Sequence, residues 1–301
     1  LMLFVAGMDY HIWQRLAVFG YLAAVALSVA VMLFGREING SKRWLALGPF
    51  SFQPSEFAKV ALILFLADLV TKNVKTIGKM WTLCRIMFWI LPIVGLVGAS
   101  NLSTAIIILG IGVILIFVAS PKYAQFALMG IAGACFMGIF LALESYRLER
   151  LAIWRNPEKY EKGYQTLQGL YAIGSGGVFG VGIGNSVQKL GFVPEAQNDM
   201  IFSIICEELG LAGAGIIVFL FLLLIWRFFL IASGSRDLFG ALIATGAMAH
   251  MMIQVILNIA VVTNTIPNTG ITLPFISYGG TSVMFLLIEM GLVLSVSQVV
   301  D

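Results

Sequence analysis

Long apolar runs separated by short polar segments dominate the chain. A helix needs about 20 mostly apolar residues to cross the hydrocarbon region of a membrane. Runs of that length predict membrane-spanning helices at residues 14–34, 55–71, 81–98, 102–119, 123–143, 201–226, 238–263 and 281–298. Residues 1–6 are expected to be the last turns of a further span. The pattern predicts an all-α, polytopic transmembrane helix bundle that forms one domain over residues 1–301.

One long segment interrupts this pattern. Residues 144–200 carry six basic and six acidic side chains and form the only large polar surface that the pattern predicts. A structureless connection of such length is uncommon and often functional. We therefore expect local helices inside this loop, one of them at about residues 165–173.

Composition strengthens the membrane prediction. Apolar residues make up 60% of the chain, charged residues 11%, and the mean hydropathy is +0.98, whereas soluble domains are roughly 45–50% apolar and about 25% charged. The net charge of +3 is small and dispersed, so nucleic-acid binding is not expected. Two histidines exclude a multi-histidine metal site and disfavour a serine hydrolase triad. Three scattered cysteines indicate no disulfide framework.

The basic residues predict the orientation of the spans. One set of short loops carries only Arg36, Lys42 and Arg43, whereas the set on the opposite side is much more basic. By the positive-inside rule the more basic set is cytoplasmic, and the loop at residues 144–200 then faces outward. The basic residues assigned to the cytoplasmic side are Arg15, Lys72, Lys75, Lys79, Arg85, Lys122, Arg227 and Arg236.

A polar group stands where the span at residues 55–71 begins. Pro54 and Glu56 suit the first turn of a helix, because proline is tolerated there and an acid matches the helix dipole. Lys59 follows Glu56 by three residues and lies on the same face. A helix-start ion pair and a functional site within the membrane explain this pair equally well, with Glu56 as the partner of Lys59. Arg43 is expected at headgroup level, where a guanidinium suits phosphate contacts.

Two acids, Glu195 and Asp199, precede the span that begins near residue 201. An acid in that position is ordinarily a helix N-cap, and Asp199 alone would be interpreted in this way. Lys189 is nearby, however, and the predicted topology brings this edge to the same side as Arg43. Chemistry at the outer membrane surface is therefore the alternative interpretation.

Two irregular segments are each open to two interpretations. Six glycines between residues 174 and 184 indicate a flexible or closely packed backbone, or a concavity whose N–H groups meet phosphate oxygens. Residues 268–282 cannot form a continuous helix, and they either line a wet cavity or form a plain outer loop.

Polar side chains also lie within the predicted spans. His250, Gln254 and Asn258 recur every four residues and predict hydrogen bonds between helices. The acids in or near the spans are costly if they face lipid, so inward positions are expected for Glu207, Glu208 and Glu289.

Several segments together resemble the SEDS family (shape, elongation, division and sporulation), which includes FtsW, RodA and SpoVE. The matching residues read NGSKRWLALG, QPSEFAK, AIGSGGVFGVGIGNSVQKLGFVPEAQNDMIFSIICEELG and TLPFISYGGTS, in the family's order. The form FVPEAQND is most similar to the FtsW/SpoVE branch. The resemblance implies ten transmembrane helices, with the large extracytoplasmic loop between the seventh and the eighth. Residues 1–6 then end the second helix, and the first helix and most of the second are expected to be missing.

One departure from the family pattern concerns the run SNLSTA, where many members carry an acid at the position of Asn101 and glycine at the position of Ser103. A catalytic or metal-binding acid is therefore not expected at that point.

The resemblance implies a peptidoglycan glycosyltransferase that polymerises lipid II at the outer face of the membrane with inversion, in cell division or sporulation. It identifies Asp199 as the catalytic base, with Glu195 supporting it and Glu56 supporting the site. The other candidates for substrate binding are Arg43, Lys59, Gln188, Lys189, Ser277 and Tyr278. Mg²⁺ or Mn²⁺ would suit carboxylate and phosphate oxygens, but the sequence identifies no cofactor and no metal ligands.

The resemblance also implies partners and a location. The expected partners are a class B penicillin-binding protein acting as transpeptidase, other divisome or elongasome membrane proteins, and lipid II and undecaprenyl pyrophosphate as ligands. The expected place is the bacterial cytoplasmic (inner) membrane, with the division septum as a candidate site. The alternative function is a lipid II flippase or transporter, which would require polar residues across the bilayer rather than at one face.

Overall fold

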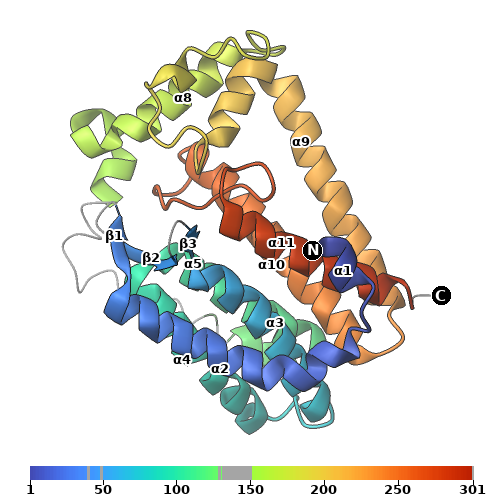
Figure 1. Cartoon of the computed structure of the whole chain (residues 1–301). Coiled ribbons are helices and arrows are strands. Elements are labelled where there is room, and N and C mark those ends of the chain that lie inside the picture. Colours follow the sequence, from blue (N-terminus) through green and yellow to red (C-terminus); the bar gives the residue numbers. More distant parts are fainter. Residues whose placement is uncertain (39–40, 48–49, 128–129, 131–150, 300–301) are drawn as a thin grey trace. The chain divides into compact units, whose positions relative to one another are not determined.

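The structure is a computed structural model that describes residues 1–38, 41–47, 50–127, 130 and 151–299 (Figure 1). Its contacts divide the chain into two compact units. The first unit comprises residues 1–123, 225–253 and 279–301, and the second comprises residues 124–224 and 254–278.

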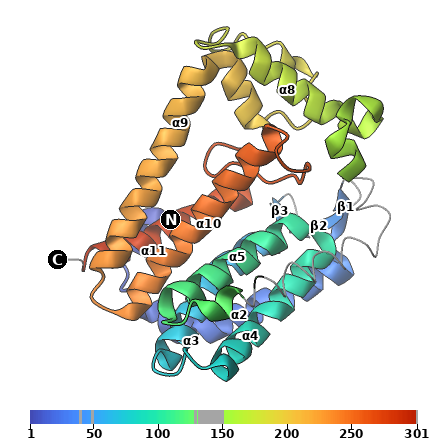
Figure 2. The ribbon, with the colours of Figure 1, turned by 180° about the vertical axis from the view of Figure 1, so that it is seen from behind.

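The first unit is a helix bundle. It contains α1 (Met2–Ala6), α2 (His11–Phe34), α3 (Pro54–Asn73), α4 (Met80–Ser100), α5 (Leu102–Ala119) and α11 (Gly280–Ser297). The end of α9 (Ile201–Gly234) and most of α10 (Leu238–Val262) belong to it as well. Helix α3 packs against α2, α4, α5 and α11, and α4 lies beside α5 (Figure 2).

The sequence explains why α3 begins and ends where it does. Pro54 occupies the first turn with Glu56, and Lys72 lies in the last turn, an arrangement that matches the helix dipole at both ends. Between them the helix is buried almost throughout, with Leu62 and Leu66 fully enclosed. A helix that is buried on nearly all sides lies in the interior of a bundle, so α3 is the core of this unit.

A small antiparallel sheet connects α2 to α3, in a region where the sequence predicted only a loop. Its strands are β1 (Arg36–Ile38), β2 (Ser41–Leu47) and β3 (Phe50–Phe52), in the order β1-β2-β3. The sheet does not change the helical class of the fold, and it carries Arg43 on its middle strand.

The second unit holds the polar loop and the elements around it. It contains the 3₁₀ turns η1 (Pro157–Lys159), η2 (Glu161–Gly163) and η3 (Gln188–Leu190), helix α8 (Tyr164–Gly176), the first part of α9 and the end of α10. Helix α8 packs on η1, η2 and η3. It contains the predicted helix at residues 165–173, so that prediction is confirmed.

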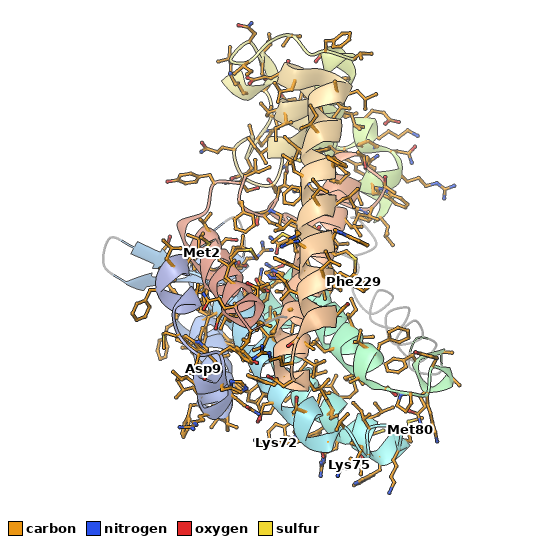
Figure 3. The ribbon with its side chains drawn as sticks, turned by 90° about the vertical axis from the view of Figure 1, so that its right-hand side faces the viewer. Met2, Asp9, Lys72, Lys75, Met80 and Phe229 are labelled. Atoms are coloured by element: carbon orange, nitrogen blue, oxygen red, sulfur yellow. The ribbon has the colours of Figure 1, made fainter. Side chains whose placement is uncertain are left out.

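The described helices also confirm most of the predicted spans. Six of them are long and apolar enough to cross a membrane: α2, α4, α5, α9, α10 and α11. Helix α3 has the predicted length but carries four charged residues. The predicted span at residues 123–143 falls mostly outside the described residues. In the first unit, Lys72 and Lys75 lie at the same end as Met80 (Figure 3), as the charge bias predicts for one membrane side.

Candidate functional site

Residues 191–200, the acidic turn, connect η3 to α9. Asp199 lies two residues before the first residue of α9, so its position at a helix start is as predicted. Only 8% of Asp199 is accessible, whereas Glu195 and Gln197 are exposed. Asp199 therefore lies just beneath an exposed rim that Glu195 and Gln197 form.

Asp199 is held from two sides. The Asn258 amide on α10 donates to the carbonyl of Asp199 at 2.9 Å and to the carbonyl of Ile271 at 2.7 Å. Gln165 Nε2 on α8 lies 3.4 Å from Asp199 Oδ1, and its own Oε1 accepts from Asn268 Nδ2 at 3.1 Å. A short backbone contact and a longer side-chain contact thus fix the aspartate between α8 and α10.

Residues 268–278 form the other wall of this assembly. Ser277 Oγ donates to the carbonyl of Asn198 at 2.6 Å and accepts from Leu273 N–H at 2.7 Å. The N–H of Tyr278 donates to the carbonyl of Gln197 at 2.8 Å, while 75% of Tyr278 is exposed. Ser277 was predicted to bind substrate, but in the structure its hydroxyl joins the two segments. The ring of Tyr278 faces outward beside the rim.

Glu195 is turned toward its own segment. Its backbone has φ of 55°, a left-handed conformation that is costly for a residue with a side chain. Its carbonyl accepts from Asn198 N–H at 2.9 Å, and its carboxylate accepts from the Asn198 side-chain amide. These contacts of Glu195 stabilise the tight bend that precedes Asp199, and its supporting role in the reaction stays a prediction.

Lys189 and Gln188, both predicted to bind substrate, lie on η3. Lys189 Nζ forms an ion pair of 2.6 Å with Glu208 Oε1 on α9. Gln188 Oε1 is buried and accepts no hydrogen bond within the described part of the chain, whereas the Gln188 carbonyl accepts from Val193 N–H at 3.0 Å. Lys189 thus connects η3 to α9 through this ion pair.

The glycine-rich stretch joins a break in α9. At Gly210 the helix is interrupted, with φ of 68° and ψ of −169°, so the backbone groups on both sides lose their helical partners. The carbonyls of Glu207 and Glu208 accept from Val181 and Gly182 N–H, each at 3.0 Å. On the other side of the break, the N–H groups of residues 211 and 212 donate to the carbonyls of residues 177 and 178 at 2.9 and 3.0 Å.

This contact explains why glycine is needed there. A Cβ on Gly180 would lie 2.1 Å from the carbonyl oxygen of Glu208, and a Cβ on Gly210 would lie 2.4 Å from Gly180 N. Of the two interpretations of residues 174–184, the closely packed backbone is therefore observed.

In the first unit, the predicted partner of Lys59 is confirmed. Lys59 Nζ lies 2.9 Å from Glu56 Oε1, and the two side chains are 2% and 8% exposed. A second buried pair joins α10 to α11, where His250 Nδ1 lies 2.8 Å from Glu289 Oε2. The hydrogen bond between helices that the sequence predicted for His250 is thus observed, and Glu289 faces inward as expected.

Arg43 lies beside a small pocket of the first unit. Its Nε donates to the carbonyl of Ser100 at 3.2 Å. Asn101, which stands where many family members carry an acid, accepts from Thr104 N–H at 3.2 Å and caps α5. Asparagine is among the best N-cap residues, which gives Asn101 a structural role here. The pocket is lined by Ser28, Val31, Arg43, Pro54, Ser55, Leu96, Val97, Ser100 and Asn101.

A metal centre finds little support in the described residues. Among them, no group of three His, Cys, Asp or Glu side chains gathers closely enough to hold an ion. The described chain therefore does not offer a complete set of protein ligands for Mg²⁺ or Mn²⁺.

Two residues that hold Asp199 were not singled out as site residues from the sequence. Asn258 belonged to a recognised polar series on α10, but its partners are loop carbonyls rather than another helix. Gln165 begins the helix that was predicted in the loop, and no local signal pointed to Asp199. Its partner is 34 residues away in the sequence.

Comparisons with known proteins identify relatives along the whole chain. A family model described as cell cycle protein, covering FtsW, RodA and SpoVE, matches residues 1–301. The stage V sporulation protein E of Bacillus subtilis is 40% identical over 310 residues, which cover 99% of this chain and 83% of that protein. The probable peptidoglycan glycosyltransferase FtsW of Coxiella burnetii is 37% identical over 300 residues, covering 95% of this chain and 79% of the relative.

Solved structures of other proteins are also similar to this chain. A chain from a structure described as "Structural coordination of polymerization and crosslinking by a peptidoglycan synthase complex" has a TM-score of 0.85 and 29% identity. The match covers 99% of this chain and 85% of that one. The crystal structure of the rod shape determining protein RodA of Thermus thermophilus has a TM-score of 0.71 and 28% identity. That match covers 99% of this chain and 82% of the RodA chain.

Proposed function

The chain belongs to the FtsW/RodA/SpoVE family of cell cycle proteins, and we propose that it polymerises lipid II with Asp199 as the general base. It is a multi-pass membrane protein and a peptidoglycan glycosyltransferase. The observation that carries the assignment of Asp199 is its setting. It is a buried carboxylate next to the exposed residues Glu195 and Gln197, and Gln165 of α8 and Asn258 of α10 position it.

The proposed reaction is an inverting transfer. A sugar hydroxyl of one substrate attacks the anomeric carbon of a lipid-pyrophosphate-linked chain, and a new glycosidic C–O bond forms. The C–O bond to the pyrophosphate breaks, and undecaprenyl pyrophosphate leaves with the bonding electrons. Asp199 accepts the hydroxyl proton as the nucleophile attacks. A base in this role contributes about a hundredfold to ten-thousandfold in rate.

Positive charge is needed to stabilise the departing pyrophosphate. The three predicted cations differ in the contacts that they already make. Lys59 and Lys189 each lie against a carboxylate, Glu56 and Glu208 respectively, so binding a phosphate would require each lysine to exchange a partner. Arg43 donates its Nε to the Ser100 carbonyl and lies beside a small pocket of the first unit, and a planar guanidinium suits bidentate phosphate contacts. Arg43 is therefore our first candidate for the anionic headgroup.

The remaining predicted groups have different proposed roles. Tyr278, with its exposed ring, is proposed to contact the incoming sugar, and the buried Oε1 of Gln188 is a candidate acceptor for a sugar hydroxyl. Ser277 and Glu195 are proposed to position the turn rather than to touch substrate. A divalent cation is not assigned a step, because the described residues do not form a ligand set for it.

The test replaces the carboxylate alone. Asp199→Asn keeps the size of the side chain and removes its basicity. Purified protein with lipid II in detergent should lose polymer formation by about a hundredfold or more while its thermal unfolding stays unchanged. Glu161→Gln, which removes an exposed carboxylate of the same loop, is the matched control and should remain active.

The detergent assay also separates the proposed function from the lipid II flippase, because no bilayer exists across which to move a substrate. Polymer formation by the wild-type protein would support the transferase. Wild-type rates in Asp199→Asn would remove Asp199 from the role of base.

The proposed partner is a class B penicillin-binding protein that cross-links the new strands, since a similar chain occurs in a complex that coordinates polymerization and crosslinking. The proposed place is the bacterial cytoplasmic membrane, with the division septum as the candidate site for an FtsW- or SpoVE-like chain. Co-purification of this chain with such a transpeptidase, and an increased polymerisation rate on its addition, would test the partnership.

A further inference from the structure

Residues 178–183, the apolar turn, lie between α8 and η3 and present apolar side chains outward. Phe179 is 85% exposed and Ile183 is 81% exposed, and Val178 and Val181 are also exposed. The surrounding residues 163–188 contain no Asp, Glu, Lys or Arg. A water-facing loop seldom combines contiguous exposed apolar side chains with so long an uncharged stretch, so this surface requires a covering.

The turn is rigidly positioned at the break in α9. Its backbone supplies the hydrogen bonds that the helix loses around Gly210, through Val181 and Gly182 on one side and Val178 on the other. Gly180 and Gly182 have φ of 78° and 101°, conformations that residues with side chains rarely adopt. The apolar side chains therefore project from a fixed point on α9. Figure 1 shows the loop after α8 beside the bend of α9.

The length of α9 indicates the depth of that point in the membrane. After Gly210 the helix runs to Gly234, which at about 1.5 Å per residue is roughly 36 Å. The hydrocarbon core of a bilayer is about 30 Å thick, and about 40–45 Å with its headgroup regions. If the Gly234 end lies at the cytoplasmic boundary, as the charge bias predicts, Gly210 lies among the outer headgroups.

The apolar turn continues a surface that already faces lipid. Directly after the break, Leu211 is 71% exposed, and Ile216, Phe219 and Leu220 follow with 61%, 57% and 57%. In a helix long and apolar enough to span the membrane, exposed apolar side chains face acyl chains. Because Val178 and Leu211 lie on either side of the same backbone contact, the turn extends this face at the headgroup end.

We propose that the apolar turn is a membrane anchor, in which Phe179 and Ile183 insert into the outer leaflet just below the headgroups. Aromatic and aliphatic side chains on an uncharged segment suit this boundary. The anchor would hold the start of α9, and with it the turn that carries Asp199, at a constant depth. The inference depends on the membrane-spanning fold and not on the role of Asp199.

The test measures the depth of residue 179 directly. Cys84, Cys135 and Cys206 are replaced by alanine, Phe179→Cys is introduced, and the thiol is labelled with an environment-sensitive fluorophore. The protein is reconstituted into phosphatidylethanolamine–phosphatidylglycerol vesicles. Emission should shift to shorter wavelength and be quenched by lipids with a doxyl group near the headgroup, with little quenching by aqueous iodide.

A matched label at Tyr160→Cys, an exposed position between η1 and η2, should instead be quenched by iodide. Labelling Ile183→Cys repeats the measurement at a second exposed side chain, so that one poorly folding variant does not decide the result. Quenching of both turn positions by iodide and not by lipid would overturn the proposal. Protection that appears only when a class B penicillin-binding protein is added, without lipid quenching, would also overturn it and assign the turn to a protein interface.

Discussion

The two units bury acids in different ways. In the first unit, Glu56 lies 2.9 Å from the Lys59 ammonium and Glu289 lies 2.8 Å from the His250 ring, and all four residues are on helices. In the second unit, Asp199 lies in a turn, where amides of Asn258 and Gln165 hold its carbonyl and its carboxylate. The first arrangement joins ionisable side chains within a bundle, and the second positions one carboxylate beneath an exposed rim.

This difference shows why a buried ionisable residue is not by itself an active site. A carboxylate paired closely with an ammonium gains little by accepting a proton, since the pair favours its charged form. At Asp199 the shorter contact, from Asn258, is made to the backbone carbonyl, and the contact of the carboxylate with Gln165 Nε2 is longer, at 3.4 Å. We therefore expect the Glu56–Lys59 pair to stabilise the first unit, and we propose that Asp199 performs the chemistry of the second.

The largest expected change in stability comes from Lys59→Met. Removing the ammonium leaves Glu56 buried without its ion partner, and breaking one half of a buried pair typically costs about 3–5 kcal/mol. Thermal or denaturant unfolding in detergent would measure the loss. Lys75→Met is the control, since Lys75 is an exposed lysine just after α3, and surface substitutions usually change stability by about 0.5 kcal/mol or less.

A double-mutant cycle with Glu56→Gln sharpens this result. Coupling between Glu56→Gln and Lys59→Met of about 0.5–3 kcal/mol is expected for residues in contact. Absence of coupling would show that the two residues act separately, and it would remove the pair from the account.

The next effect tests how the second unit is held. Gly210→Ala places a Cβ 2.4 Å from Gly180 N and on a backbone with positive φ, so we expect a loss of about 1–3 kcal/mol from the backbone conformation together with the clash. Hydrogen exchange should become faster in residues 177–182. Gly184→Ala is the control, because Gly184 also has positive φ but has open space around it. Equal effects of the two changes would exclude a role for close backbone contact.

A smaller loss of stability, with a clear loss of activity, is expected from Asn258→Leu. The change leaves the carbonyls of Asp199 and Ile271 without the amide that joins them, at a cost of about 1–3 kcal/mol. A small displacement of a catalytic group can lower a rate by about a hundredfold, which a lipid II polymerisation assay would measure. Thr263→Val, at the exposed end of α10, should leave the rate unchanged. An unchanged rate in Asn258→Leu would show that Asp199 needs no such support.

The smallest expected effect is a change in how the stability of the first unit depends on pH. It concerns Asp237, in the loop before α10. Burial raises the pKa of Asp237, but hydrogen bonds from Tyr10 and from Gly240 N–H outweigh it and leave the pKa below the ordinary value of 3.8. A carboxyl group with a lowered pKa stabilises the fold above its unfolded pKa, and this contribution disappears as the pH falls through the folded pKa.

Asp237→Asn should therefore weaken the acid dependence of the unfolding temperature below about pH 4. Because asparagine caps helices as well as aspartate does, the variant should keep most of its stability at neutral pH. Thermal unfolding from neutral to acidic pH would measure both effects. An unchanged acid dependence would show that other carboxylates control it.

The sequence predicted the helices well because their apolar runs are long. The span expected at residues 102–119 matches α5 at both ends, and the expected contact of Lys59 with Glu56 is observed because residues three apart share a helix face. Both predictions depend on local spacing alone.

What the sequence did not predict depends on contacts between distant segments. The break at Gly210 follows from its packing against the glycine-rich stretch about 30 residues earlier in the sequence, and glycine is compatible with many other conformations. The spacing of Asn258 predicted a hydrogen bond to another helix. Its side-chain amide instead donates to the carbonyls of Asp199 and Ile271, which lie in loops. The burial of Asp199 likewise depends on residues 268–278, which no local pattern brings to it. The role of Asp199 as a base remains a prediction.

The most direct test of the central claim is the single-turnover rate of lipid II bound to Asp199→Asn, measured together with the affinity for lipid II. If Asp199 accepts the proton, affinity should stay close to that of the wild-type protein while the rate falls by about a hundredfold to ten-thousandfold. A wild-type rate, or a loss of affinity that accounts for the whole decrease, would contradict the assignment of Asp199 as the base.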